Sequence, residues 1–208
     1  MFNKKRFAQL KRKTNEVDIN GQFNLDGSGK TEINTGFEPL NHLLTLFVFH
    51  GLFDLDLKAK GDLQHHIIED IGIALGKALK ESLGSKQGIN RYGTFSVTMD
   101  KVVVEANVDI SGRPSITKKI TDDKDIINNI LANDKFDDTN FSYKDAEEFL
   151  EAFVQHSGLS LVYIIKSGEG DLHHILEALF KALGKAIDQA SQIDPRRRGV
   201  PSTKGIID

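Results

Sequence analysis

The chain has 208 residues, 39% of them hydrophobic, and a formal net charge of -3 at pH 7. This composition suffices for a hydrophobic core in one large domain or two small ones, and the near-neutral charge argues against nucleic acid as the main partner. The chain has no cysteine, so disulfides are excluded and any metal ligands must be His, Asp or Glu. No apolar run reaches about 18 residues and no signal-peptide pattern is present, so we expect no membrane partner and a cytoplasmic location.

The first half of the chain predicts strands and helices in alternation. Residues 4–26 alternate loosely and lead into a turn signal at 26–29, which predicts a hairpin whose second strand is 30–35. Residues 39–50 have the apolar spacing of a helix that begins at a proline. Residues 53–60 alternate with the period of a half-buried strand. The other elements expected here are a helix from a turn at 61–62 to about residue 84 and strands at 93–99 and 102–110.

The second half repeats this order of elements. Residues 117–143 are rich in Asp, Asn and Lys and predict a connector with room for a short helix. The elements expected after it are a helix at 144–156, a strand at 159–165, a turn at 168–171 and a helix at 173–190. We therefore expect an α+β fold with two half-repeats, residues 1–116 and 117–208, packed as one unit with the helices together and a sheet on each outer side.

The last helix of each half carries the same histidine motif. Residues 65–79 and 173–187 match at a constant offset of 108, with nine of fifteen positions identical. Residues four apart on a helix share a face, so His65 and Glu69 can bind one ion together, whereas His66 points about 100° away. The second copy offers His173 with Glu177, and His174 as the residue that points elsewhere. One such motif is commonly a solvated polar stripe, but packing alone does not require the motif twice.

The repeat also predicts how two metal sites are built. When the halves are aligned backwards from the histidine pairs, His42 falls opposite Glu148, and both residue types bind divalent ions. Each site then takes the helical pair of one half and the remaining histidine of the other. One site contains His42, His66, His173 and Glu177, and the other contains His65, Glu69, Glu148 and His174. This mixture suits octahedral Mn(II), Fe(II) or Zn(II), and the spacing leaves open whether the halves meet within one chain or across chains.

Further motifs extend over nearly the whole chain. They are RKTNE at 12–16, TG at 35–36, LNH at 40–42, HGLFDL at 50–55, both histidine motifs, NRYG at 90–93, DISGRP at 109–114, FKA at 180–182 and VPSTKG at 200–205. Together they resemble the imidazoleglycerol-phosphate dehydratase family of histidine biosynthesis. Two features depart from the family pattern: only Leu63 and Gln64 separate Gly-Asp from the first histidine pair, where many members have five residues, and the strand at 161–163 has no histidine.

The resemblance implies a fold, an activity and an assembly. The fold is of the ribosomal protein S5 domain 2-like type. The reaction is the elimination of water from imidazole glycerol phosphate, a small phosphorylated substrate, to give imidazole acetol phosphate. Two Mn²⁺ ions per active site would supply the electron sink that removal of a weakly acidic proton needs. The family forms homo-oligomers of 24 subunits, built from trimers, with active sites between subunits.

The resemblance also assigns residues. The metal ligands are His42, His65, His66, Glu69, His173, His174 and Glu177, with Glu148 at a position that is His in many members. The residues for substrate and its phosphate are His50, Arg91, Arg113, Lys181, Ser202, Thr203 and Lys204. Glu16 matches an acid that contacts substrate and assists proton transfer, and Glu69 and Glu177 are further catalytic candidates. Without the resemblance, we would interpret the arginines as surface ion pairs and His50 as a helix C-terminal cation.

Two other functions remain as alternatives. A duplicated protein that binds metal only for assembly would have the same histidine motifs, but it would not need Arg91, Arg113, Lys181 and the 202–204 segment as a phosphate pocket. A metallohydrolase is not favoured, because the HExxH pattern is absent from the sequence.

Overall fold

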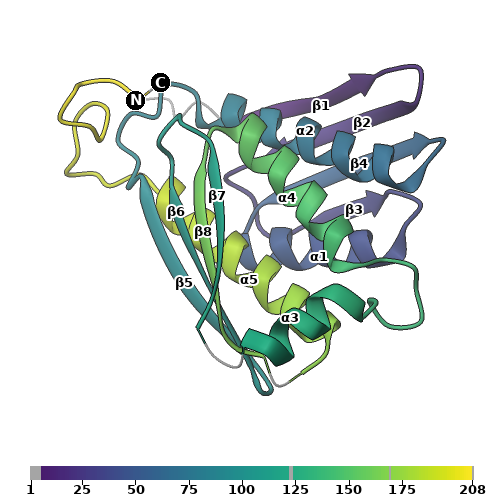
Figure 1. Ribbon diagram of the computed structural model, residues 1–208. Coiled ribbons are helices and arrows are strands. Elements are labelled where there is room, and N and C mark those ends of the chain that lie inside the picture. Colours follow the sequence, from purple (N-terminus) through teal and green to yellow (C-terminus); the bar gives the residue numbers. More distant parts are fainter. Residues whose placement is uncertain (1–5, 122–123, 169, 208) are drawn as a thin grey trace.

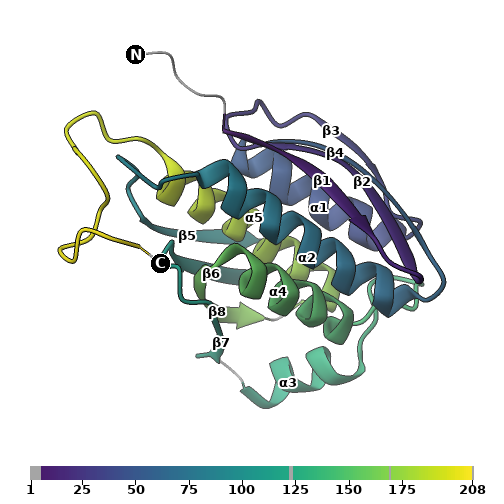
Figure 2. The ribbon, with the colours of Figure 1, turned by 90° about the horizontal axis from the view of Figure 1, so that it is seen from above.

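The computed structural model describes residues 6–121, 124–168 and 170–207 of the chain. These residues form four layers, in which two sheets lie on the outside and the long helices lie between them (Figure 1, and from above in Figure 2). This arrangement confirms the expected α+β fold with internal duplication. Within the described residues, no helix is both long and apolar enough to cross a lipid bilayer.

The first unit holds four strands and two helices. They are β1 (Phe7–Lys13), β2 (Val17–Asn24), β3 (Thr31–Asn34), α1 (Glu38–Gly51), β4 (Asp54–Gly61) and α2 (Gln64–Leu83). The strand order is β1-β2-β4-β3, in which β1, β2 and β4 are antiparallel neighbours and β3 is parallel to β4. The α1 helix forms the crossover that a parallel pair of strands requires.

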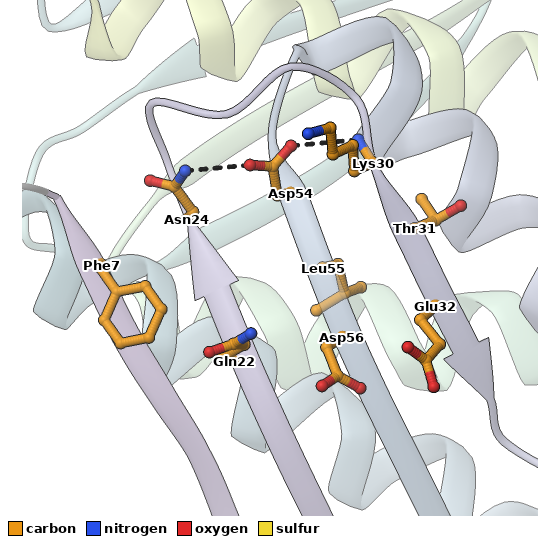
Figure 3. Close-up of a pocket in the computed structure, with 9 residues that line it drawn as sticks. All are labelled: Phe7, Gln22, Asn24, Lys30, Thr31, Glu32, Asp54, Leu55 and Asp56. Carbon is orange, nitrogen blue, oxygen red and sulfur yellow. Dashed lines mark hydrogen bonds between the residues drawn. The ribbon is translucent and has the colours of Figure 1, made fainter.

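The start of the chain differs from the prediction. The prediction of a hairpin around 26–29 is wrong. The segment expected as its first strand, 4–26, contains both β1 and β2, with their turn at 14–16. Residues 4 and 5 of this segment lie outside the described residues. The Thr14 hydroxyl accepts hydrogen bonds from two of the next N–H groups and closes that turn. After β2 the chain crosses to the far side of β4, and the Asp54 carboxylate accepts hydrogen bonds from this crossing segment (Figure 3).

The second unit repeats the first and adds one helix. Its elements are β5 (Tyr92–Met99), β6 (Val102–Asp109), β7 (Ser115–Ile120), α3 (Lys124–Asn133), α4 (Tyr143–Ser157), β8 (Ser160–Gly168) and α5 (Leu172–Ser191). The strand order β5-β6-β8-β7 has the same pattern of antiparallel and parallel neighbours as the first sheet. Of the turn expected at 168–171, residue 169 lies outside the described residues.

The sheets place the border between the units earlier than the histidine repeat suggested. A division after residue 116 would cut β7 and would remove β5 and β6 from the sheet that they form with β8. The border therefore lies between α2 and β5. The expected connector at 117–143 contains most of β7 as well as α3. This strand has no apolar alternation because it is an edge strand, whose residues between Ile116 and Ile120 are exposed.

The helical layers bring the two units together. The α2 helix packs against α4, and α1 packs against α5, so each helix pair joins the two halves of the chain. Glycines allow close contact in both pairs. A Cβ at Gly76 would lie 2.5 Å from the carbonyl oxygen of Phe153, and a Cβ at Gly184 would lie 2.4 Å from that of Phe47. These contacts occupy equivalent positions of the repeat, so the same packing solution positions α1 against α5 and α2 against α4.

Candidate metal centre

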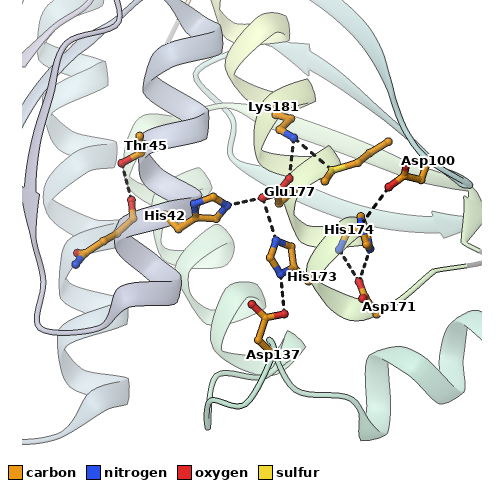
Figure 4. A network of polar contacts seen from close by, with 11 residues as sticks. His42, Thr45, Asp100, Asp137, Asp171, His173, His174, Glu177 and Lys181 are labelled. Carbon is orange, nitrogen blue, oxygen red and sulfur yellow. Dashed lines mark hydrogen bonds and ion pairs between the residues drawn. The ribbon is translucent and has the colours of Figure 1, made fainter.

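Two imidazoles and one carboxylate converge where α1 packs against α5. His42 lies near the start of α1, and His173 and Glu177 share one face of the first turns of α5 (Figure 4). One carboxylate oxygen of Glu177 contacts Nε2 of His42 and lies 3.0 Å from Nε2 of His173. Their potential ligand atoms all lie within 4.8 Å of one another. The sequence predicted these three residues in one site together with His66, from the four-residue spacing and from the alignment of the halves.

Glu177 is ionised in this environment. The residue is 5% exposed, and burial alone would raise the pKa of its carboxyl group. Hydrogen bonds from Lys181, His42 and His173 outweigh burial and lower the pKa of Glu177 to about 2. A buried carboxylate that faces two imidazole nitrogens therefore keeps its negative charge at neutral pH, as a metal ligand must.

Lys181 lies one helical turn beyond Glu177. Its ammonium group donates to the second Glu177 oxygen at 2.7 Å and contacts the sulfur of Met99 at 3.3 Å. The carboxylate thus divides its contacts, with one oxygen on the lysine and the other on the histidines (Figure 4). His50 belongs to the same region: burial, followed by the charges of Lys181 and Lys185, lowers the pKa of His50. Of the predicted substrate-binding residues, the structure therefore brings Lys181 into direct contact with the cluster.

His173 has a second carboxylate partner that the sequence did not reveal. Its Nδ1 lies 2.8 Å from Oδ1 of Asp137, and its ring stacks on Phe136 with 4.3 Å between ring centroids. Burial alone would lower the pKa of His173, but the hydrogen bonds with Asp137 and Glu177 outweigh it and raise the pKa. Asp137 and Phe136 lie in the segment between α3 and α4, which has no repeated motif that could have identified them.

The remaining histidine of each motif points to a different environment. His174 lies 2.6 Å from Asp171 and 3.2 Å from Asp100. His66 lies 2.8 Å from Asp62 and 3.8 Å from Glu16, and the hydrogen bond with Asp62 raises the pKa of His66. Asp62 and Asp171 belong to the Gly-Asp pairs before the two motifs, which the sequence indicated only as turns.

The second predicted site is less compact. Among the described residues, the group formed by His42, His173 and Glu177 is the only compact set of three potential ligands, and it does not include His66. Glu69 of α2 and Glu148 of α4 line a cavity of about 540 Å³ that runs along α4 to the start of β7, together with Glu151 and His156. The ring of His65 packs against that of His66, with 4.3 Å between centroids. The two four-residue sites proposed from the repeat stay predictions in their full form.

The predicted phosphate residues fall into two groups besides Lys181. The Arg91 guanidinium donates two hydrogen bonds to Asp109, at 2.7 and 3.2 Å, and one to the carbonyl oxygen of Pro201 at 3.0 Å. This contact brings Arg91 next to the segment with Ser202, Thr203 and Lys204. Three of the five guanidinium N–H donors of Arg91 are thus used within the chain. Arg113 is exposed in the turn after β6.

Comparison with known proteins identifies relatives over nearly the whole chain. The family model for imidazoleglycerol-phosphate dehydratase matches residues 35–187. Imidazoleglycerol-phosphate dehydratase of Pelobacter propionicus is 47% identical over 205 residues, which cover 97% of this chain and 99% of the relative. The protein of the same name from Clostridium novyi is 47% identical over 199 residues, which cover 94% of this chain and 95% of the relative.

Solved structures have the same fold. The crystal structure of imidazoleglycerol-phosphate dehydratase from Staphylococcus aureus has a TM-score of 0.76 and 34% identity, and the match covers 90% of this chain and 99% of that one. The structure of IGPD from Pyrococcus furiosus in complex with (S)-C348 has a TM-score of 0.75 and 33% identity, and covers 96% and 99%. From these matches in sequence and in fold, it follows that the chain belongs to the imidazoleglycerol-phosphate dehydratase family.

Proposed function

We propose that this protein is a manganese-dependent hydro-lyase that converts imidazole glycerol phosphate to imidazole acetol phosphate in histidine biosynthesis, in the cytoplasm. The observation that carries the proposal is the convergence of His42, His173 and Glu177 in a chain of this family. The donors fit the proposed ion, because imidazole nitrogen with carboxylate oxygen suits Mn²⁺ and no thiolate competes for the site. When bound, Mn²⁺ supplies Lewis-acid stabilisation of the charge that develops on the substrate ring.

The residues of the chain perform the other tasks of the elimination. Glu16 lies 3.8 Å from the proposed metal ligand His66, which supports a role for Glu16 in moving the proton that leaves the substrate. Arg91 and the 202–204 segment meet at Pro201, which supports phosphate binding there. Lys181 holds the second oxygen of Glu177 and contacts the sulfur of Met99, and its third N–H donor would serve an anionic ligand. The binding roles of His50 and Arg113 are part of the same proposal.

We further propose that the active site is shared between subunits of a homo-oligomer, which the family resemblance suggests is a 24-subunit assembly of trimers. The support from this chain is the position of His66 and His174, which lie outside the compact cluster and remain partly exposed. The start of α5 from one subunit would face the start of α2 from another. His66 would then complete the coordination of the first ion. The second ion would be bound by His174 together with His65, Glu69 and Glu148.

Metal removal and return tests this proposal against the assembly-only alternative. We expect metal-free protein to be inactive, and added Mn²⁺ to restore formation of imidazole acetol phosphate and to increase the particle mass measured by light scattering. Glu177→Gln should lower kcat/KM by more than about 100-fold, because Glu177 is itself a proposed metal ligand. The loss of a residue that only hydrogen-bonds to a metal ligand already costs about 10–100-fold in affinity or activity. Assembly on addition of Mn²⁺ without turnover would favour the alternative, a metal-binding protein without catalysis.

A further inference from the structure

The contact between Asp137 and His173 goes beyond the ligand set of the candidate centre. Asp137 Oδ1 lies 2.8 Å from Nδ1 of His173, while Nε2 of the same ring lies 3.0 Å from Glu177. We propose that Asp137 is a positioning residue, which holds the Nδ1 proton of His173 and thereby directs Nε2 to the cation. This inference rests on the proposed function, because it assigns a role toward the cation of that same site.

The chemistry of the two groups determines which nitrogen carries the proton. An ionised carboxylate only accepts hydrogen bonds, so the nitrogen that faces Asp137 must be the N–H donor. Nε2 faces the ionised carboxylate of Glu177, which also only accepts, so both ring nitrogens donate while no cation is bound. A cation at the site would take the place of the Nε2 proton, and Asp137 would keep the proton on Nδ1, so that the lone pair on Nε2 is left for the cation. A metal-bound histidine needs its lone pair on the coordinating nitrogen, and carboxylate partners on the other nitrogen commonly provide this selection.

Phe136 restrains the same ring in a second direction. Its ring stacks on the imidazole of His173 with an interplanar angle of 16°, and it is 4% exposed. The ring of Phe136 also lies 6.1 Å from that of His42. The stack sets the plane of the imidazole, and the hydrogen bond to Asp137 sets its rotation within that plane. Together they hold Nε2 toward Glu177 (Figure 4).

The segment that carries Asp137 is held by its own hydrogen bonds. The N–H of Phe136 donates to the carbonyl oxygen of Phe141 at 2.8 Å, and Lys135 forms an isolated bridge with Ser142. The Thr139 hydroxyl donates to the carbonyl oxygen of Phe136 at 2.5 Å and accepts from the N–H of Phe141 at 3.1 Å. Asp137 itself has φ of +50°, a value that Asp tolerates better than most residues. The carboxylate is thus positioned by its segment, independently of the histidine.

Within the part of the chain that the structure describes, this support belongs to only one of the two repeated motifs. The segment lies between β7 and α4, where the chain runs from residue 121 to 142, whereas the equivalent connection between β3 and α1 contains only residues 35–37. In the first motif, His65 packs against the ring of His66 instead. The Asp137 segment therefore makes the two cation positions unequal, and we expect its removal to weaken one class of bound Mn²⁺.

The test compares three variants of the full-length protein. Mn²⁺ affinity is measured on metal-free protein by electron paramagnetic resonance of free Mn²⁺, and kcat and KM are measured at limiting and saturating Mn²⁺. Asp137→Ala should weaken the affected Mn²⁺ class by about 10–100-fold and recover most of kcat at saturating Mn²⁺. Asp137→Asn retains an acceptor oxygen and should lose less. The control Asp138→Ala removes a neighbouring exposed carboxylate and should bind Mn²⁺ as the wild type does.

Three results would overturn the inference. The first is wild-type Mn²⁺ affinity in folded Asp137→Ala. The second is an equal loss of Mn²⁺ affinity in Asp137→Asn and Asp137→Ala, and the third is an equal loss in Asp138→Ala. The second and third results would assign the effect to charge alone. Thermal unfolding of each metal-free variant separates a binding defect from a folding defect, and Asp137→Asn keeps the test decisive if Asp137→Ala does not fold. Affinity is measured without turnover, so failure of the proposed dehydratase activity would be recognised separately.

Discussion

Glu177 connects most of the polar network at the candidate centre, and its contacts illustrate how far a single residue can be predicted. Its partnership with His173 follows from their spacing on one helix face, and its partnership with His42 follows from the internal repeat. The contact with Lys181 also has the four-residue spacing. The contact of His173 with Asp137 has no such basis, because the two residues are 36 positions apart and lie on unrelated elements.

Asp54 lines a cavity of about 440 Å³ away from the histidines (Figure 3), and its hydrogen bonds lead to a prediction about a single residue. Its carboxylate accepts hydrogen bonds from the N–H groups of Ser28 and Lys30 at 2.7 and 3.1 Å and from the Asn24 amide at 3.1 Å. Burial alone would raise the pKa of Asp54, but these hydrogen bonds outweigh it and lower the pKa below 3.8. We expect Asp54→Asn to lower the free energy of unfolding by about 1–3 kcal/mol at pH 7.

The pH dependence of this effect has a definite sign. Because the folded-state pKa of Asp54 is lowered, its stabilising contribution is fully present above the unfolded-state pKa near 4 and is lost as pH falls through the folded-state value. Urea unfolding at constant protein concentration should therefore show a difference between wild type and Asp54→Asn that shrinks from pH 7 to pH 3. The neighbouring Asp56→Asn serves as control. A difference that is independent of pH would contradict this explanation.

At the scale of the elements, the close contact of α1 with α5 determines how His42 meets Glu177. The carbonyl oxygen of Phe47 in α1 occupies the space that a Cβ at Gly184 in α5 would need. Gly184→Ala must therefore separate the two helices or shift one along the other, although alanine itself favours a helix. We expect it to lower the free energy of unfolding by about 1–3 kcal/mol, as overpacked cores do, and to weaken Mn²⁺ binding.

The equivalent substitution in the other helix pair is the matched comparison. Gly76→Ala should destabilise the fold by a similar amount, because its Cβ would meet the carbonyl oxygen of Phe153. It acts on the contact of α2 with α4 and should leave the contact between His42 and Glu177 in place. Urea unfolding and Mn²⁺ titration of both variants, with the exposed Lys80→Ala as control, check this. Unchanged stability of Gly184→Ala would show that the helix contact is softer than the geometry indicates.

The internal duplication is the main feature at the scale of the whole molecule. Each unit presents one histidine pair at the start of a helix, but the two starts belong to different helix pairs, since α2 packs against α4 and α5 against α1. In the assembly proposed above, one chain carries two half-sites, and a complete site needs the α5 start of one subunit and the α2 start of another. This geometry permits a mixing experiment.

Two inactive variants should restore activity when they assemble together. His66→Ala keeps the cluster of His42, His173 and Glu177 intact, whereas Glu177→Gln keeps the histidines of α2 intact. If sites are shared between subunits, a one-to-one mixture that is dissociated by metal removal and reassembled with Mn²⁺ should contain intact sites at about one quarter of positions by random pairing. The expected readout is activity near a quarter of wild type. No activity above that of the separate variants would indicate that each site lies within one chain.

The sequence by itself determined the local features of this protein. Helical periodicity placed His173 with Glu177 on one face, the repeat related His42 to Glu148, and alternation identified most strands, because these patterns depend on residues that are near in the chain or copied within it. Only the tertiary structure decided that β5 and β6 join β8, that β3 pairs with β4, and that Asp137 and Phe136 support His173. Such contacts join segments without a shared pattern, and they form because the helical layers bring those segments together in space.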